Sequence, residues 1–322
     1  MENTNQQNNS RRKADFPPSL WGCSFASFSF PQTEFKSYSR QAEELKENVK
    51  DMLMASKKDP VEHIEFINLL CRLGVSYHFD KEIENNLKEI FADLPNLLEK
   101  HDFYLYTLSL LFRVFRQHGF KMLCVVFDKF KDTNGEFKKT IINDVKGILS
   151  LYEASFLSVH GEQILDDALV FTKANLESSA MQSSPQARKY ISFYEEDESR
   201  NDTLLKFAKI DFNRVQLIHQ QELSILSRGD CASGVECYMK QYDVSEKKAI
   251  EEIQKMDSDA WKDINEDCMR PTNAPMLLLQ HFVNLVRVTD VIYENDDDSY
   301  TIPLGLKDYV ALLYIEQLPL YE

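Results

Sequence analysis

The chain has 322 residues and a formal net charge of -15, with 52 acidic against 37 basic residues, and 43% of its residues are hydrophobic. This acidic excess repels a phosphate backbone and argues against a nucleic-acid partner, although a local basic or metal-loaded pocket would still suit a phosphorylated small molecule. No apolar run approaches the roughly 20 residues that a membrane-spanning helix needs, so we expect no membrane span.

Turn-forming residues are scarce in this sequence. It holds 9 glycines and 10 prolines and is rich in Leu, Glu, Lys and Phe, which favours long helices joined by short connections. The predicted fold class is therefore all-α. Six cysteines occur without any CxxC pair, so we expect isolated reduced thiols rather than a zinc site.

The N-terminal residues 1–10, MENTNQQNNS, are polar and have nothing to bury, so we expect them to be disordered. They contain no apolar signal region, and too few residues precede Arg11 for an organelle transit peptide, which predicts a cytoplasmic location. Residues 14–40 combine three prolines with scattered aromatic residues, a pattern that predicts an extended arm.

From about residue 38 to 160, apolar side chains recur at helical spacing. The segment 103–116, FYLYTLSLLFRVFR, is apolar on most faces, as expected of a helix inside a bundle. The sequence DTNGEF at 132–137 predicts a turn between helices. This part of the chain is therefore expected to form a compact helical bundle.

Helical periodicity continues over residues 161–227, with a break at SSPQ. The acidic run EEDESRND at 195–202 is expected to cap the following helix, because carboxylates favour helix N-termini, and metal binding by this crowded run is the weaker alternative. Three further helices are expected, at 235–268 with Ser245 as a plausible N-cap, at 274–293 and at 304–316.

Four co-linear stretches of the chain resemble plant terpene synthases. They are Arg11, Arg12 and Trp21 near the N-terminus; YISFYEEDESRNDTLLKFAKIDFNRVQLIHQQEL at 190–223; VECYMKQY at 235–242 with WKDINED at 261–267; and the tail from Leu285 to Leu320. The length of the second stretch and the shared order make the resemblance specific, and it covers nearly the whole chain.

The resemblance implies two all-α domains. We expect an N-terminal arm over 1–34, a helical domain without chemistry of its own over 35–203, and a remnant of the class I catalytic helical bundle over 204–322. In the family, the class I pocket ionises a prenyl diphosphate such as farnesyl diphosphate with Mg2+ or Mn2+ ions. Metal ions held by carboxylates stabilise the leaving diphosphate, and an aromatic cavity without water protects the cation.

The family places its metal ligands on a DDxxD helix and an (N/D)Dxx(S/T)xxxE helix, and an RxR loop closes on the diphosphate. None of these patterns occurs here: Asp166-Asp167 fails the first motif, and the run from Asn295 has Pro303 where the second needs glutamate. The segment ending at Arg228 runs directly into Gly229, where the family has a long run of helices. By length the chain is about 200 residues short of a typical two-domain member.

Two groups of residues match family features outside the metal motifs. Tyr293, Asp298 and Tyr300 match a lid loop over the pocket mouth, with a polar surface turn as the alternative. The residues Arg11, Arg12 and Trp21 match an arm that folds across the entrance, with a loose basic tail as the alternative.

Three hypotheses follow for this chain, which we expect to be a monomer. The first is an inactive terpene synthase homologue without a productive metal site. The second is an active sesquiterpene synthase, either working through non-standard ligands or represented here by an incomplete gene model. The third is a non-catalytic helical interaction module. Loss of the intervening helices is expected to leave the apolar faces of 204–219 and 276–288 without partners and to weaken the C-terminal part.

Overall fold

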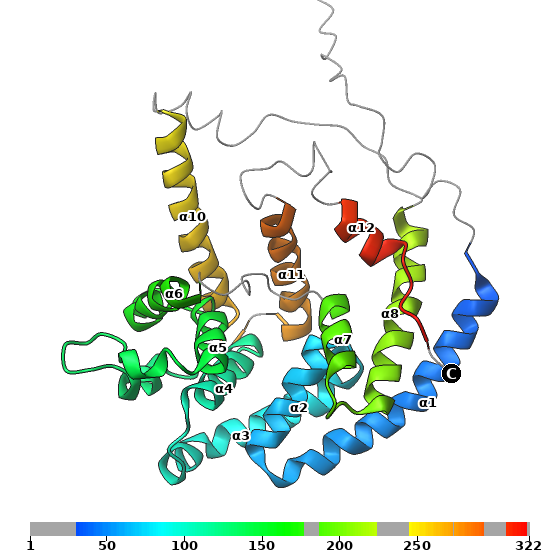
Figure 1. Ribbon diagram of the computed structural model, residues 1–322, viewed down its shortest axis with the longest axis horizontal. Helices are drawn as coiled ribbons and strands as arrows, with labels where there is room; N and C mark the ends of the chain where they lie inside the picture. Colours follow the sequence, from blue (N-terminus) through cyan, green and yellow to red (C-terminus); the bar gives the residue numbers. More distant parts are fainter. Residues whose placement is uncertain (1–29, 177–186, 224–244, 273, 293–306, 321–322) are drawn as a thin grey trace, which may run out of the picture.

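The computed structural model describes residues 30–176, 187–223, 245–272, 274–292 and 307–320, and this part of the chain is built from helices (Figure 1). Its one β feature is an isolated bridge between Lys131 and Phe137, which closes the turn expected at 132–137. The all-α prediction is confirmed. None of the described helices is long and apolar enough to cross a membrane.

The first three helices form a layer at the base of the molecule. They are α1 (Gln32–Ala55), α2 (Pro60–Arg72) and α3 (Asp80–Lys100), joined by the short 3-10 turns η1 (Ser56–Lys58) and η2 (Ser76–Phe79). Because α1 begins at Gln32, the extended arm expected over 14–40 is wrong for 32–40. Asp59 starts α2, because its carboxylate accepts hydrogen bonds from the amides of Val61 and Glu62 at 2.7 and 3.0 Å.

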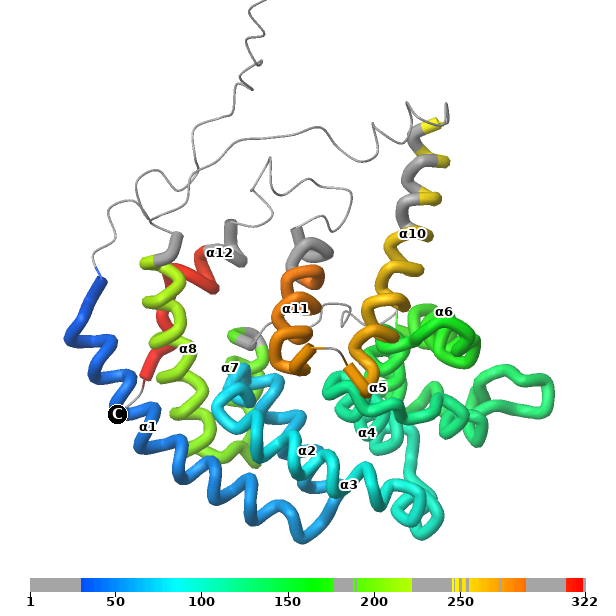
Figure 2. The backbone as a smooth tube through the Cα atoms, turned by 180° about the vertical axis from the view of Figure 1, so that it is seen from behind, coloured from blue at the N-terminus to red at the C-terminus, as the bar shows by residue number. Residues whose placement is uncertain are grey.

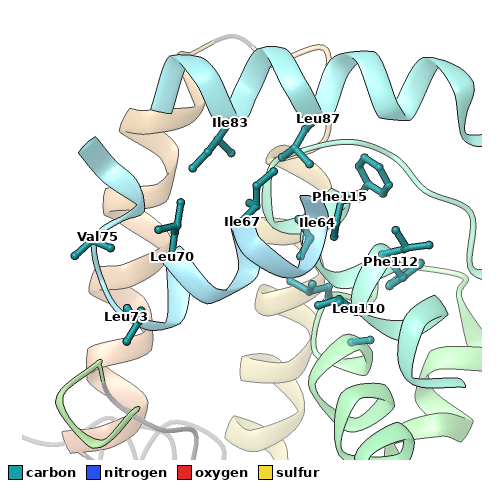
Figure 3. Close-up of a cluster of buried hydrophobic side chains, with 14 of the residues drawn as sticks. Ile64, Ile67, Leu70, Leu73, Val75, Ile83, Leu87, Leu110, Phe112 and Phe115 are labelled. Atoms are coloured by element: carbon teal, nitrogen blue, oxygen red, sulfur yellow. The ribbon is translucent and has the colours of Figure 1, made fainter. Parts of the chain in front are cut away.

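Helix α4 (Leu105–Gln117) is the centre of the core. Ten of its side chains are buried, on every face, as the sequence of 103–116 predicts. Figure 3 shows Ile64, Ile67 and Leu70 of α2 beside Ile83 and Leu87 of α3, with Leu110, Phe112 and Phe115 of α4 next to them. The fully buried ring of Phe112 meets Phe127 edge-on, with ring centroids 5.2 Å apart.

The following helices wrap this centre. They are α5 (Val145–Ser155), α6 (Gln163–Leu176), α7 (Ala187–Glu196) and α8 (Asp202–Leu223), with the 3-10 turns η3 (Cys124–Phe130) and η4 (Lys139–Ile141) before α5. Helix α5 lies between α4 and α6, while α8 runs along α1 (Figures 1 and 2).

The last three helices are α10 (Glu246–Asp267), α11 (Met276–Ile292) and α12 (Lys307–Tyr314). The bounds of α11 and α12 are close to the predicted 274–293 and 304–316, whereas the first ten residues of the helix predicted over 235–268 lie outside the described structure. Ser245 caps α10 as expected, accepting from the Lys248 amide at 3.4 Å. Among the described residues, neither α10 nor α11 packs along its length on another helix, and both project from the body of the molecule (Figure 2).

The expectation that both apolar faces after residue 203 lack partners is wrong for α8. Leu204, Phe207, Ala208 and Ile210 are buried: α8 runs along α1, and the ring of Phe207 lies against His78 and Phe79 of η2. The expectation holds for α11, whose Phe282 and Leu285 side chains are 61% and 64% exposed. The weakly packed part of the molecule therefore starts after α8, not at residue 204.

Candidate functional site

The residues expected to close a pocket lie outside the part of the chain that the structure describes. Tyr293, Asp298 and Tyr300 fall in 293–306, and Arg11, Arg12 and Trp21 fall in 1–29, so their roles stay predictions. Helix α11 ends at Ile292, immediately before the segment 293–306. It is therefore the described element nearest in sequence to the expected lid residues.

Helix α11 presents an open apolar face. A hollow of about 540 Å³ lies against it, lined by Pro275, Leu277, Leu278, His281, Phe282 and Leu285. Leu277 and Leu278 are each 50% exposed. Full burial of such a side chain contributes roughly 1.5–3 kcal/mol, and these half-exposed leucines forgo part of it, so this face has the composition of one that packs on other helices.

The lower end of α11 is anchored where the α10–α11 connection meets the end of α4. Gly119 has φ +78°, and a Cβ there would lie 2.2 Å from the Met276 Cε atom and 2.7 Å from the Cys268 carbonyl oxygen. The Arg270 amide donates to the Gly119 carbonyl at 2.8 Å, and its guanidinium contacts Glu84 at 3.1 Å and lies over the Phe120 ring. Glycine is therefore required at 119, both for its backbone and for this close approach.

The acidic residues that resemble metal ligands in sequence have structural partners. The Asp166 carboxylate pairs with Lys262 of α10 at 2.9 Å, and that of Asp167 pairs with Lys131 at 3.0 Å. Among the described residues, no group of three His, Cys, Asp or Glu side chains could hold a metal ion.

The acidic run at 195–202 caps the following helix, as predicted, but through an amide rather than a carboxylate. Asn201 Oδ1 accepts from the Leu204 amide at 3.0 Å at the start of α8, whereas the Asp197 carboxylate accepts from the Ser199 amide at 2.8 Å, before the helix. The hydrogen bonds to Ser199 lower the pKa of the Asp197 carboxyl.

Two buried arginines on α4 were not identified from the sequence as site or core residues. The Arg116 guanidinium is fully buried, donates to the Met122 carbonyl at 2.6 Å and pairs with the Glu162 carboxylate at 2.5 and 3.1 Å. Arg113 lies 3.4 Å from Glu153, and burial lowers the pKa of its guanidinium. Their presence in an otherwise apolar helix is the signal that would have predicted buried carboxylate partners.

A second polar group joins η2 to α8. Tyr77 donates to the buried Asp211 carboxylate at 2.6 Å, Arg214 donates to it at 2.8 Å, and His78 Nε2 lies 3.1 Å from it. Burial raises the pKa of the Asp211 carboxyl, but these partners outweigh it and the net pKa is lowered. Burial and the Asp211 charge raise the pKa of Tyr77.

This polar group borders a pocket of about 260 Å³, which Leu313 and Tyr314 of α12 also line. Each charged member of the group has a partner within it, so the arrangement is that of a structural link.

Comparison with known proteins identifies two matching domain models. The model of the terpene synthase N-terminal domain matches residues 20–194, and that of the terpene synthase family metal-binding domain matches residues 219–263. Probable terpene synthase 8 of Ricinus communis is 59% identical over 249 residues, which cover 70% of this chain and 45% of that protein. The chain thus spans about half the length of this relative.

Solved structures of the same family share the fold. A limonene synthase crystallised with 2-fluorolinalyl diphosphate has a TM-score of 0.57 and 27% identity, covering 92% of this chain and 62% of that one. Isoprene synthase from grey poplar leaves, in complex with three Mg2+ ions and dimethylallyl-S-thiolodiphosphate, has a TM-score of 0.54 and 25% identity, covering 85% of this chain and 59% of that one.

One comparison shows where the length difference lies. The alignment with probable terpene synthase 6 of Ricinus communis is 34% identical over 548 residues and takes in 96% of this chain and 99% of that protein. Because this chain has 322 residues, more than 200 of the 548 aligned positions face no residue of it. Since nearly all of both chains is included, those positions lie within the alignment rather than at its ends.

Proposed function

Because this chain belongs to the terpene synthase family, we propose that it is a terpene synthase homologue whose 322 residues do not by themselves catalyse the family reaction. The family uses divalent metal ions and binds prenyl diphosphates. The reaction that we propose for the complete catalytic unit is the Mg2+-dependent ionisation and cyclisation of farnesyl diphosphate to a sesquiterpene.

The observation that carries this proposal is the missing ligand set. The printed sequence contains no DDxxD, no (N/D)Dxx(S/T)xxxE and no RxR pattern. The nearest acidic pair, Asp166 and Asp167, is already engaged with Lys262 and Lys131. The internal stretch that the 548-residue alignment leaves unmatched is long enough to carry all three motifs.

The physical consequence concerns the leaving group. Breaking the carbon–oxygen bond releases a diphosphate anion, and each bound metal ion contributes several kcal/mol to stabilising the charge that develops. A cation also needs a cavity that excludes water. The hollow on α11 is open to solvent, so it does not exclude water, and its lining is almost entirely apolar, so it does not supply the positive charge that the diphosphate needs.

The lid and arm keep their proposed places in the complete unit. In the sequence, Tyr293 directly follows the last residue of α11, and Asp298 and Tyr300 come shortly after it. We propose that they form the lid of the pocket, and that Arg11, Arg12 and Trp21 form an arm across its entrance.

The test is an assay of the purified chain with farnesyl diphosphate and Mg2+, with products extracted and analysed by gas chromatography. Probable terpene synthase 6, prepared in the same way, serves as the full-length family control. We expect no terpene above the heat-treated control, also with geranyl and geranylgeranyl diphosphate. Any metal-dependent terpene product from this chain would contradict the proposal.

Two alternatives have specific support. The exposed α11 face favours a non-catalytic role as a helical interaction module. The internal position of the unmatched residues favours an incomplete gene model of an active sesquiterpene synthase. Sequencing transcripts across the Arg228–Gly229 junction separates them: a message that contains additional coding sequence there restores the catalytic assignment.

A further inference from the structure

The last described residues of the chain run along α8 and are held there mainly by hydrogen bonds to their main-chain atoms. Helix α12 and residues 315–320 follow α8 back toward α1 (Figure 1). We call residues 312–318, together with the side chains of α7 and α8 that hold them, the C-terminal clasp.

Three side-chain contacts reach the last carbonyl groups of α12, which have no partner within the helix itself. Arg188 of α7 donates to the Leu312 carbonyl at 2.6 Å, and Gln216 of α8 donates to that of Leu313 at 3.1 Å. Gln220 donates to the Tyr314 carbonyl. Arg188 and Gln216 also both donate to the carbonyl of Glu316.

A two-way pairing completes the clasp beyond the helix. Asn213 donates to the Leu318 carbonyl at 2.9 Å and accepts from the Leu318 amide at 2.8 Å. The Asn213 side chain is fully buried, and Leu318 is 6% exposed and belongs to the core. The side-chain amide of Asn213 thus pairs with the backbone of Leu318 as a residue on a neighbouring strand would. The buried Leu318 side chain anchors the tail.

We propose that this face of α7 and α8 is a peptide-docking site. It accepts a helix C-terminus followed by a leucine four residues beyond the last helical residue, and its resident occupant is the chain's own C-terminal segment. Most of the polar contacts are to main-chain atoms, and those of the tail side chains are confined to Glu316 with Arg188 and to Gln317 with Glu34 and Tyr38. Recognition therefore depends mainly on the backbone path and on Leu318.

The resident segment can leave this site as a unit. Among the described helices, α12 packs mainly on α8, and α11, which precedes it in the chain, packs along no other helix. Fourteen residues outside the described structure, 293–306, connect the two. Release of the tail therefore breaks the clasp and uncovers the 260 Å³ pocket beside Tyr77 and Asp211 without disturbing the core around α4.

Hydrogen exchange on the full chain tests the resident contacts. We expect the amides of 311–320 to exchange by a local opening, well before those of α4. The Asn213→Leu variant should speed exchange at the Leu318 amide by roughly tenfold or more, while the matched variant Ile315→Ala leaves it unchanged. Exchange of 311–320 only together with α4 would refute release as a unit, and no change in Asn213→Leu would refute the clasp.

A tail-side variant tests docking itself and leaves α8 untouched. Leu318→Pro removes the amide that Asn213 accepts from, so the resident tail is weakened and the site becomes available. A labelled peptide with the sequence of residues 307–322 should then bind the full-length Leu318→Pro chain. The same peptide carrying Leu318→Pro should not bind, and binding should disappear in the chain that also carries Asn213→Leu.

The proposal is overturned if the natural peptide fails to bind a Leu318→Pro chain whose α4 amides remain protected. It is also overturned if both peptides bind equally, since recognition would then not use the Leu318 amide. Should Asn213→Leu expose α4 to exchange, the comparison of the two peptides on the Leu318→Pro chain decides the question alone.

Discussion

Helices α4 and α11 are both strongly apolar, yet one is enclosed and the other is open. Ten of the thirteen residues of α4 are buried, whereas no described side chain of α11 is. The difference lies in the neighbours: α4 is surrounded by α2, α5 and η3, while α11 is fixed at its lower end by the Gly119–Arg270 contact. An apolar sequence shows that a helix needs packing partners, and the rest of the chain determines whether those partners are present.

The largest expected effect contrasts one phenylalanine from each helix. Phe112→Ala should lower the free energy of unfolding by about 3–5 kcal/mol, because it leaves a cavity beside Phe127 in the core. Phe282→Ala, at a side chain that is 61% exposed, should change it by less than about 0.5 kcal/mol. Urea denaturation followed by circular dichroism measures both, and equal losses would show that α11 is packed after all.

The next contrast compares a buried ion pair with an exposed one. Glu162→Gln leaves the Arg116 guanidinium without a counter-charge in the core and should cost about 3 kcal/mol of unfolding free energy. Asp263→Asn breaks the contact between the Asp263 carboxylate of α10 and His160. Because the Asp263 side chain is 70% exposed and that of His160 is 47% exposed, the change should cost less than about 1 kcal/mol. The same denaturation experiment compares them, and a larger loss for Asp263→Asn would reverse the assignment of the stable region.

A pH dependence of stability is expected at His118, at the end of α4, where the α10–α11 connection contacts it through Arg270. Burial, helped by the charge of Arg270, lowers the pKa of His118 from 6.5 to about 4. Between these values the unfolded chain binds the proton and the folded chain does not, so the stability that His118 contributes is complete above pH 6.5 and is lost as the pH falls toward 4. The loss amounts to roughly 3 kcal/mol, and His118→Gln should remove that part of the pH dependence.

Denaturation curves at several pH values check this, with the exposed His101→Gln as control. If the two variants show the same pH dependence as the unchanged chain, His118 is not the group responsible.

The smallest effect on stability, and the clearest on surface properties, is expected at the α11 face. Phe282→Lys should leave the unfolding free energy unchanged within about 0.5 kcal/mol but reduce the binding of a hydrophobic fluorescent dye. Val170 of α6 is similarly exposed but does not line this hollow, so Val170→Lys should reduce dye binding little. Equal effects of the two variants would mean that the hollow is not the dye-binding surface.

Sequence reasoning identified the helices and the family because both depend on local patterns. The spacing of apolar residues placed α4 and α11 within a few residues of their ends, and Ser245 marked the start of α10 correctly. It failed at α8, because periodicity shows that a face must be covered without showing that α1, about 170 residues earlier, covers it. The partners of Arg116 and Asn213 are long-range for the same reason.

The candidate site was predictable only in part, for a different reason. The motif search depends on spacing along the sequence, so it could establish which ligand patterns the sequence does not contain. It could not show that Asp166 and Asp167 pair with lysines from distant segments, or that the carbonyls ending α12 meet Arg188, Gln216 and Gln220. Those contacts depend on how helices meet, and a single sequence does not record this.

Hydrogen exchange across α4 and α11 tests the central contrast most directly. Core helices exchange through global unfolding, whereas weakly packed ones exchange through local opening at much lower free energy. We predict that the amides of Leu105–Gln117 exchange roughly 100-fold or more slowly than those of Met276–Ile292, after correction for intrinsic rates. Equal protection of the two helices would contradict the account, since it would mean that α11 is as well packed in solution as the centre of the core.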